Sequence, residues 1–236
     1  MTIYIVEEGD TVCSIAKEFD ISKELLARIN DICCEEDLIV GDSILILCPD
    51  VTYTVKPGDT IGDIVDRFDT SFMEILRNNP WLIEREYIYP DEEIIISYKC
   101  KKDKMVSING YAFVHIDRGV LAKTLPYLSY LTVYSYYINS DATLIDIDDI
   151  SLIQIAKLYG VAPIMLVTSS KTNGEYNFEL THELLANEDL QCSLINNILL
   201  NLEKKGYYGL TIDFPYVHPN DRELYVDFVK KITEIL

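Results

Sequence analysis

The sequence repeats itself near its N-terminus. Residues 4–11, YIVEEGDT, recur as residues 53–60, YTVKPGDT, 49 positions later. The same offset pairs many later positions without a gap, among them Asn30 with Asn79. Because chance does not keep one register over so many positions, the chain is expected to fold these stretches into two copies of one small unit.

Each copy shows the same order of local patterns. A short alternating strand leads to a Gly-Asp turn, and Thr11 or Thr60 then suits a helix N-cap. Apolar residues follow at helical spacing through two helices, and an apolar strand closes each copy at residues 43–47 or 93–97. The pattern predicts a βααβ unit with both helices packed on one face of a two-stranded antiparallel sheet.

The motif Tyr-x-Val-x-x-Gly-Asp-Thr, followed by Ile, Phe and Asn at fixed distances, resembles the LysM family over residues 2–48 and 52–98. The resemblance implies binding of GlcNAc-containing polymers, peptidoglycan or chitin-like, between the loop after the first strand and the loop before the last. An N-acetyl group offers one N–H, one C=O and one methyl, which the backbone of tight loops and a small apolar side chain can meet. The predicted contacts are Gly9, Asp10, Thr11, Val12 and Ile32 in the first copy, and Gly58, Asp59, Thr60, Ile61 and Trp81 in the second.

Two of these assignments have structural alternatives. Gly-Asp-Thr is also a strand-to-helix turn with a cap, whatever it binds. Trp81, the only tryptophan, either lines the groove or packs as a core residue. The corresponding loop of the first copy, residues 31–37, is acidic, so the two copies are expected to differ in affinity. Each copy alone should bind weakly, and tandem linkage raises avidity.

The pattern changes after a short basic stretch, residues 98–104, which is the predicted domain boundary. Strands now alternate with helices, as in βα units with a parallel sheet. The fold class expected for the whole chain is therefore α/β, with four βα units in residues 106–236. The predicted strands are residues 106–114, 130–136, 162–168 and 208–214.

Residues 109–112 (NGYA), 159–163 (YGVAP) and 205–214 (KGYYGLTIDF) resemble family 18 glycoside hydrolases, specifically the LysM-bearing spore-cortex-lytic enzymes. The resemblance implies a TIM-type (β/α)8 barrel that cuts chitin-like or peptidoglycan strands. A complete barrel typically needs about 250 residues, so residues 106–236 are expected to form a partial one. Self-association, a separately encoded second half and a truncated sequence are all compatible with this, and the apolar helical stripe before Leu236 fits a truncation.

The catalytic motif of that family is incomplete in this chain. The family's fourth strand reads Asp-Gly-x-Asp-x-Asp-x-Glu, and its final Glu is the general acid. Aligned on Gly209, the chain keeps Asp213 but has Thr211 at an acidic position and Pro215 at the Glu position. Proline has no proton to donate, and loss of general acid catalysis typically costs about 10²–10⁴ in rate. The second half is therefore predicted to be catalytically degenerate, since Asp221 lies beyond the strand.

Aromatic residues near the strand ends are candidate sugar contacts by the same resemblance: Tyr111, Tyr136 and Tyr216. Tyrosine is abundant, with 17 in the chain, so packing is the alternative for each of them.

Charge and composition exclude other classes of function. A net charge of −19 repels nucleic-acid phosphates and anionic membranes. No apolar run reaches the roughly 20 residues of a membrane span, and the first residues lack a signal-peptide pattern. Six cysteines without a C-x-x-C pair and three scattered histidines predict no metal site and no cofactor. The family resemblance implies cytoplasmic synthesis in a spore-forming bacterium and a place at the spore surface, cortex or cell wall.

The leading functional hypothesis is a glycan-binding protein with a degenerate family 18 half-domain. The alternative is a peptidoglycan or chitin-type N-acetylglucosaminidase of spore cortex lysis, completed by a partner or a missing C-terminal half. A spore-coat or envelope assembly protein is the third.

Overall fold

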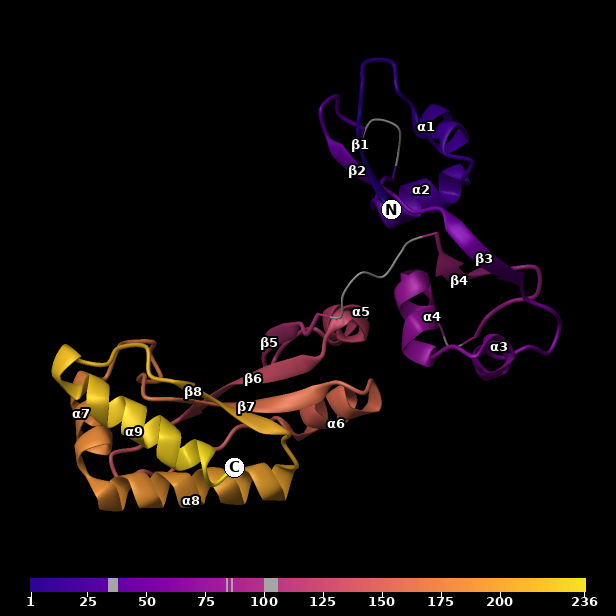
Figure 1. Ribbon diagram of the computed structural model, residues 1–236. Helices are drawn as coiled ribbons and strands as arrows, with labels where there is room; N and C mark the ends of the chain where they lie inside the picture. The colour runs from indigo at the N-terminus through magenta and orange to yellow at the C-terminus, as the bar shows by residue number, and fades with distance from the viewer. Residues whose placement is uncertain (34–37, 84, 86, 100–105) are drawn as a thin grey trace. The chain divides into compact units, whose positions relative to one another are not determined.

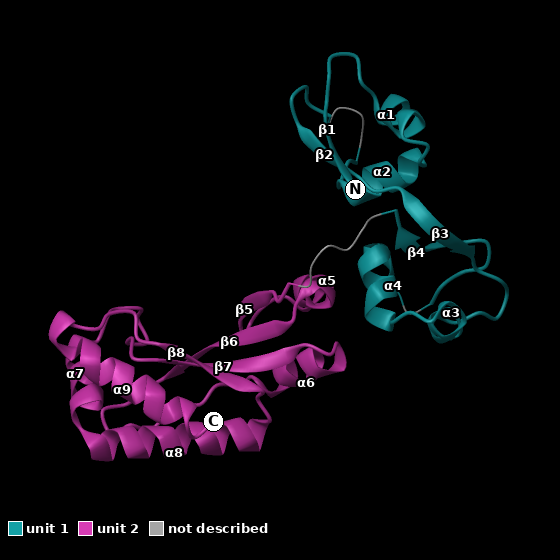
Figure 2. Ribbon diagram, in the orientation of Figure 1, with its two compact units in different colours: residues 1–105 teal, residues 106–236 magenta. Residues whose placement is uncertain are grey.

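The computed structural model describes residues 1–33, 38–83, 85, 87–99 and 106–236. The chain divides into two compact units, Met1–Met105 and Val106–Leu236 (Figure 2). Most of the basic stretch predicted as the boundary, and the last four residues (34–37) of the acidic loop predicted in the first copy, lie outside the described residues. None of the helices in the described ranges is long and apolar enough to cross a bilayer.

The first unit contains two βααβ motifs in succession (Figure 1). β1 pairs with β2 and β3 pairs with β4, both antiparallel, as the repeated pattern predicts. The first motif consists of β1 (Thr2–Ile5), α1 (Val12–Glu18), α2 (Lys23–Ile29) and β2 (Ser43–Ile46). The second consists of β3 (Pro49–Thr54), α3 (Ile61–Phe68), α4 (Phe72–Asn78), the 3₁₀ turn η2 (Pro80–Leu82) and β4 (Glu93–Tyr98).

One asparagine in each motif ties the second helix to the closing strand. Asn79 is fully buried, its amide donates to the carbonyls of Ile75 and Ile95, and its oxygen accepts from the Ile95 N–H, all at 2.8 Å. Asn30 makes the same three bonds to Leu26 and Leu45 in the first motif. Because these bonds satisfy backbone groups that helix and sheet leave unpaired, the repeated asparagine is a structural residue.

The second unit is built on a four-stranded parallel sheet in the order β5-β6-β7-β8. The strands alternate with helices, as predicted, and β5 and β8 are the edges of the sheet in the described residues. The elements are β5 (Asn109–Phe113), α5 (Arg118–Thr124), η3 (Leu125–Tyr127), β6 (Tyr130–Tyr137), α6 (Ile150–Leu158), β7 (Ala162–Thr168), α7 (Phe178–Ala186), α8 (Glu188–Lys205), β8 (Gly209–Asp213), η4 (Pro219–Asp221) and α9 (Arg222–Thr233).

The two faces of this sheet differ. Alternate residues of the strands, such as Val133 and Met165, are fully buried in a core shared with the helices. On the other face of β5, Tyr111 and Phe113 are 56% and 55% exposed, and both rings contact Tyr134 on β6. The helices therefore cover one face, and aromatic rings line part of the other.

A buried polar network joins the sheet to its helices. The fully buried Asp149 accepts hydrogen bonds from the hydroxyls of Tyr136 and Tyr207. The Lys205 ammonium lies 2.8 Å from the Asp149 carboxylate and donates to the Tyr136 hydroxyl at 2.6 Å. Burial, followed by the hydrogen bond to Asp149, raises the pKa of both phenols, which therefore stay protonated donors. The network fixes the start of α6 against the end of α8.

Candidate functional site

The turn after the first strand is held by an aspartate in both motifs. The Asp10 carboxylate accepts from the Tyr4 hydroxyl at 2.9 Å and from the Glu7 N–H at 2.7 Å. Asp59 accepts in the same way from Tyr53 at 2.5 Å and from the Lys56 N–H at 3.0 Å. These bonds raise the pKa of Tyr4 to about 12 and hold the pKa of Asp59 below its usual value. Each aspartate therefore shapes the turn through one oxygen of its carboxylate, Oδ2.

The next residues of the motif are also engaged in the fold. Thr11 and Thr60 cap α1 and α3, accepting from the N–H of Ser14 at 3.0 Å and of Asp63 at 3.2 Å. Val12 is only 6% exposed, and Ile61 is half-buried. Contacts to an N-acetyl group from this turn therefore fall mainly to its backbone, as the sequence analysis anticipated for the polar groups.

Backbone pairing brings the second loop beside this turn. In the first motif Val6 donates to Asp42 at 2.9 Å and accepts from Gly41 at 2.8 Å. In the second, Val55 exchanges equivalent bonds with Glu92 and Asp91, both at 2.9 Å. In each motif the valine before the first loop is thus bonded to residues at the end of the second loop. The two loops predicted to form the glycan site therefore lie side by side.

The second loop exposes an apolar residue at the same position in both motifs. Ile39 is 62% exposed and its structural counterpart Tyr89 is 61% exposed; each accepts a backbone hydrogen bond from the residue three positions on, Asp42 or Glu92. The second motif has one more residue than the first between its buried asparagine and its closing strand, so the 49-residue offset of the sequence does not pair Ile39 with Tyr89. They are the better candidates for an apolar contact with a sugar or its acetyl methyl, because the residues predicted for that role face the protein.

Ile32 and Trp81 are those inward-facing residues. Ile32 packs against the core of the first motif. The Arg28 guanidinium carbon lies 4.5 Å from the centroid of the Trp81 ring, and the buried indole N–H has no hydrogen-bond partner among the residues that the structure describes. Of the two interpretations of Trp81, its surroundings favour the packing one.

The LysM domain family matches residues 4–46 and 53–97. The chain carries LysM domains. The two motifs of the first unit are called LysM modules 1 and 2 below.

Relatives of known structure and annotation extend the comparison to the second unit. The cortical fragment-lytic enzyme of Bacillus subtilis is 35% identical over 243 residues, which is 100% of this chain and 55% of that protein. The crystal structure of the Bacillus megaterium spore cortex-lytic enzyme SleL matches with a TM-score of 0.72 at 28% identity, over 98% of this chain and 55% of that one. The chain is thus similar to these cortex-lytic enzymes and spans about half their length.

The fold of the second unit has a wider likeness. The class V chitinase of Pseudomonas fluorescens matches with a TM-score of 0.50 at 18% identity, over 53% of this chain and 40% of that one. The α/β fold with a parallel sheet is therefore similar to part of the fold of this chitinase.

Asp213 is the last residue of β8, at the carboxyl edge of the sheet. Among the described residues its partly buried carboxylate has no hydrogen-bond or ion-pair partner. Thr211 lies within the same strand, and Pro215 lies exposed in the bend that follows. Of the three positions aligned with acidic residues of the family motif, only Asp213 carries a carboxylate. Pro215, at the position of the general acid, cannot donate a proton.

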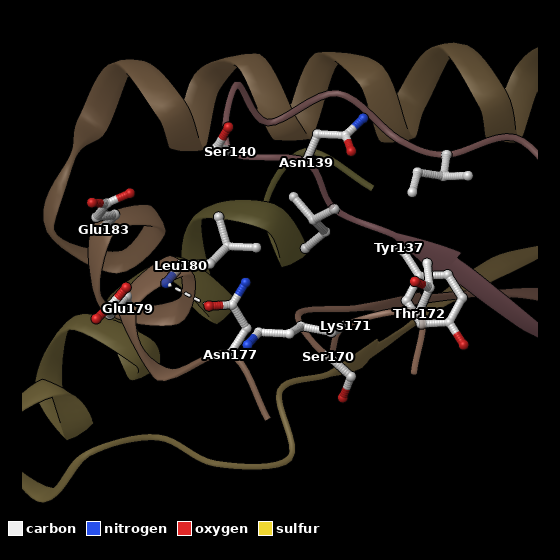
Figure 3. Close-up of a pocket in the computed structure, with 12 residues that line it drawn as sticks. Tyr137, Asn139, Ser140, Ser170, Lys171, Thr172, Asn177, Glu179, Leu180 and Glu183 are labelled. Atoms are coloured by element: carbon white, nitrogen blue, oxygen red, sulfur yellow. Dashed lines mark hydrogen bonds between the residues drawn. The ribbon is translucent and has the colours of Figure 1, made fainter. Parts of the chain in front are cut away.

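A cavity of about 490 Å³ opens at the same edge, where β6 and β7 end and α7 begins (Figure 3). Such edges are where ligands bind in parallel α/β folds. Glu179 and Glu183, one helical turn apart on α7, stand on its wall, together with Asn139, Lys171 and Asn177. No sequence motif predicted this cavity, although the i, i+4 spacing of the two glutamates places them on one side of a helix.

The three tyrosines predicted as sugar contacts are not brought together. Tyr136 is fully buried in the Asp149 network, so its prediction as a sugar contact is wrong. Tyr111 lies on the edge strand β5, whereas Tyr216 follows β8 at the other edge, 42% exposed and packed 4.6 Å from the Phe178 ring. Asp221 is 5% exposed and bonded to His182 at 3.0 Å, so it is no free acid either.

Proposed function

We propose that this protein binds GlcNAc-containing glycan of the peptidoglycan or spore-cortex type through its LysM modules and does not hydrolyse it. The observation that carries the proposal is the identical construction of both modules. Each holds a Gly-Asp-Thr turn by a Tyr–Asp hydrogen bond beside a loop that exposes a large apolar or aromatic side chain at the same position, Ile39 or Tyr89. Selection for a fold alone does not require that exposed residue, whereas a sugar face or an acetyl methyl does.

The lack of an acid supports the non-catalytic half of the proposal. Hydrolysis of this type needs one carboxylic acid to protonate the leaving oxygen while the substrate acetamide attacks. Asp213 can orient an acetamide, but Pro215 offers no proton. We therefore assign the second unit to glycan contact at the carboxyl edge of the sheet, where Tyr216, which packs against Phe178 at the start of α7, is the proposed aromatic contact.

The alternative function is hydrolysis, and one observation favours it. Glu179 and Glu183 stand on the cavity at the same sheet edge as Asp213, so a carboxylate is available within the unit. In this alternative a second copy or a further polypeptide segment would pair with the open strands β5 and β8 and complete the barrel.

The two Bacillus relatives named above are a cortical fragment-lytic enzyme and a spore cortex-lytic enzyme, so we propose the spore cortex or its surface as the place of action of this chain as well.

Calorimetric titration with soluble GlcNAc oligomers tests the binding half. We expect saturable binding at up to two sites per chain, and no binding of glucose oligomers of equal length, which lack the acetamido group that the turns recognise. Equal binding of both sugars, or of neither, would contradict the proposal.

A further inference from the structure

The connection between the two LysM modules is very short. β2 of module 1 ends at Ile46 and β3 of module 2 begins at Pro49, so only Leu47 and Cys48 join them. Cys48 packs against the core of module 1, while its carbonyl accepts a 2.8 Å hydrogen bond from the Lys99 N–H after β4. Because Cys48 is held by both modules, this connection has little freedom to act as a hinge.

One side-chain contact also crosses between the modules. Arg28, in the last turn of α2, places its guanidinium carbon 4.5 Å from the centroid of the Trp81 ring in module 2. A guanidinium over an indole face is an attractive cation–π pair, and tryptophan is the best aromatic partner for it. Arg28 also stands near the negative end of its own helix, where a cation is favoured.

The surroundings of Trp81 show that its ring serves protein contacts. One ring face is covered by Arg28, and the indole N–H is buried with no acceptor among the described residues. A buried unpaired N–H is unfavourable, so a residue kept for hydrogen bonding to sugar would not be placed in this way. The counterpart position in module 1 is Ile32, which cannot make such a pair.

We propose that Arg28 and Trp81, together with the shared Cys48, lock the two LysM modules in one mutual orientation, so that they read a single glycan strand long enough to reach both sites. Arg28 and Trp81 are positioning residues and do not contact sugar. This inference rests on the proposed glycan binding. Its physical basis is preorganisation: a rigid pair of sites loses less freedom when both bind one strand than a flexible pair does.

The test compares short and long GlcNAc ligands on full-length chains. Arg28→Ala and Trp81→Ala are expected to leave the affinity for a short oligomer, which fills one module, unchanged. Their affinity for soluble long-chain glycan should fall by about 2- to 10-fold, since exposed cation–π pairs are worth a few-fold each. Arg28→Lys should keep most of the wild-type affinity for long-chain glycan, because the cation over the Trp81 ring remains. Lys23→Ala, which removes a charge from the exposed start of the same helix, is the matched control and should change neither affinity.

Residual dipolar couplings supply a readout that local packing alone would not move. In the wild type both modules should share one alignment tensor, and in Arg28→Ala or Trp81→Ala the two tensors should diverge. A drop in short-oligomer affinity for Trp81→Ala but not Arg28→Ala would make Trp81 a sugar contact and overturn the inference. Unchanged long-glycan affinity in both variants would also overturn it. Failure of the wild type to bind any GlcNAc oligomer would instead reject the proposed function itself.

Discussion

Replacing Lys205 by methionine is expected to lower the free energy of unfolding of the second unit by about 3–5 kcal/mol. The Lys205 side chain is 5% exposed, and its ammonium contacts the carboxylates of Asp149 at 2.8 Å and Asp146 at 2.5 Å. Methionine would leave the fully buried Asp149 carboxylate without its counter-charge. Because a buried ion that loses its partner keeps its desolvation penalty, this costs more than the pair contributes.

Urea unfolding followed by circular dichroism and by tryptophan fluorescence measures this effect. Trp81 is the only tryptophan and lies in the first unit, so its fluorescence transition should stay in place while the transition of the second unit moves to lower urea. Lys204→Met, an exposed neighbour on α8, is the control and should change stability by less than about 0.5 kcal/mol. Adding Asp149→Asn to Lys205→Met should recover part of the loss. Equal effects of Lys204→Met and Lys205→Met would rule out the ion pair as the cause.

This network also supports the cavity at the sheet edge. Asp146 and Asp149 belong to the connection from β6 to α6, which also carries Asn139, Ser140 and Ile145 of the cavity wall. A change at Lys205 therefore alters the second unit near the proposed glycan contact.

Gly58→Val is expected to weaken binding to peptidoglycan by roughly 10²-fold or more, because it removes one of two linked sites and with it their avidity. Gly58 has a φ of 90°, in the region that a β-branched residue does not adopt without strain. The turn that carries Asp59 and Thr60 must then move, and its backbone groups leave the positions proposed for the acetamido group. Co-sedimentation with insoluble peptidoglycan over a range of protein concentrations measures the change.

Gly62→Ala provides the control for this prediction. Gly62 lies in α3, where an added Cβ would meet only the Thr60 hydroxyl at an ordinary 3.5 Å. This variant should bind as the wild type does. Gly9→Val makes the equivalent change in module 1, where Gly9 has a φ of 91°. Undiminished retention of Gly58→Val and Gly9→Val alike would show that these turns do not form the binding sites.

The sequence predicted the LysM modules well because each signal acts locally. The Gly-Asp-Thr motif specifies a turn by Tyr–Asp hydrogen bonds six residues apart and a cap three residues apart, and it recurs in one register. The order of strands and helices in the second unit was predictable for the same reason. The sequence did not predict which loop residues are exposed, since the exposure of Ile39 and Tyr89 depends on the folded module.

Tyr136 shows why side-chain roles in the second unit could not be predicted. Residues 130–137 are almost uniformly apolar or aromatic, so alternation does not reveal which side chains face the helices. A register shift between Val133 and Tyr136 then turns Tyr136 to the same side as Val133, against simple alternation. Its partners Asp149 and Lys205 lie 13 and 69 residues away, a separation that no local pattern encodes.

The most direct measurement of the central claim is a pull-down of the purified chain with insoluble spore-cortex peptidoglycan, followed by mass spectrometry of the soluble fraction. We predict retention of the protein on the glycan with no sugar fragments released, in the wild type and in Asp213→Asn alike. Release of GlcNAc-ended fragments by the wild type, and its loss in Asp213→Asn, would show that another carboxylate replaces the missing acid and that the chain is a hydrolase.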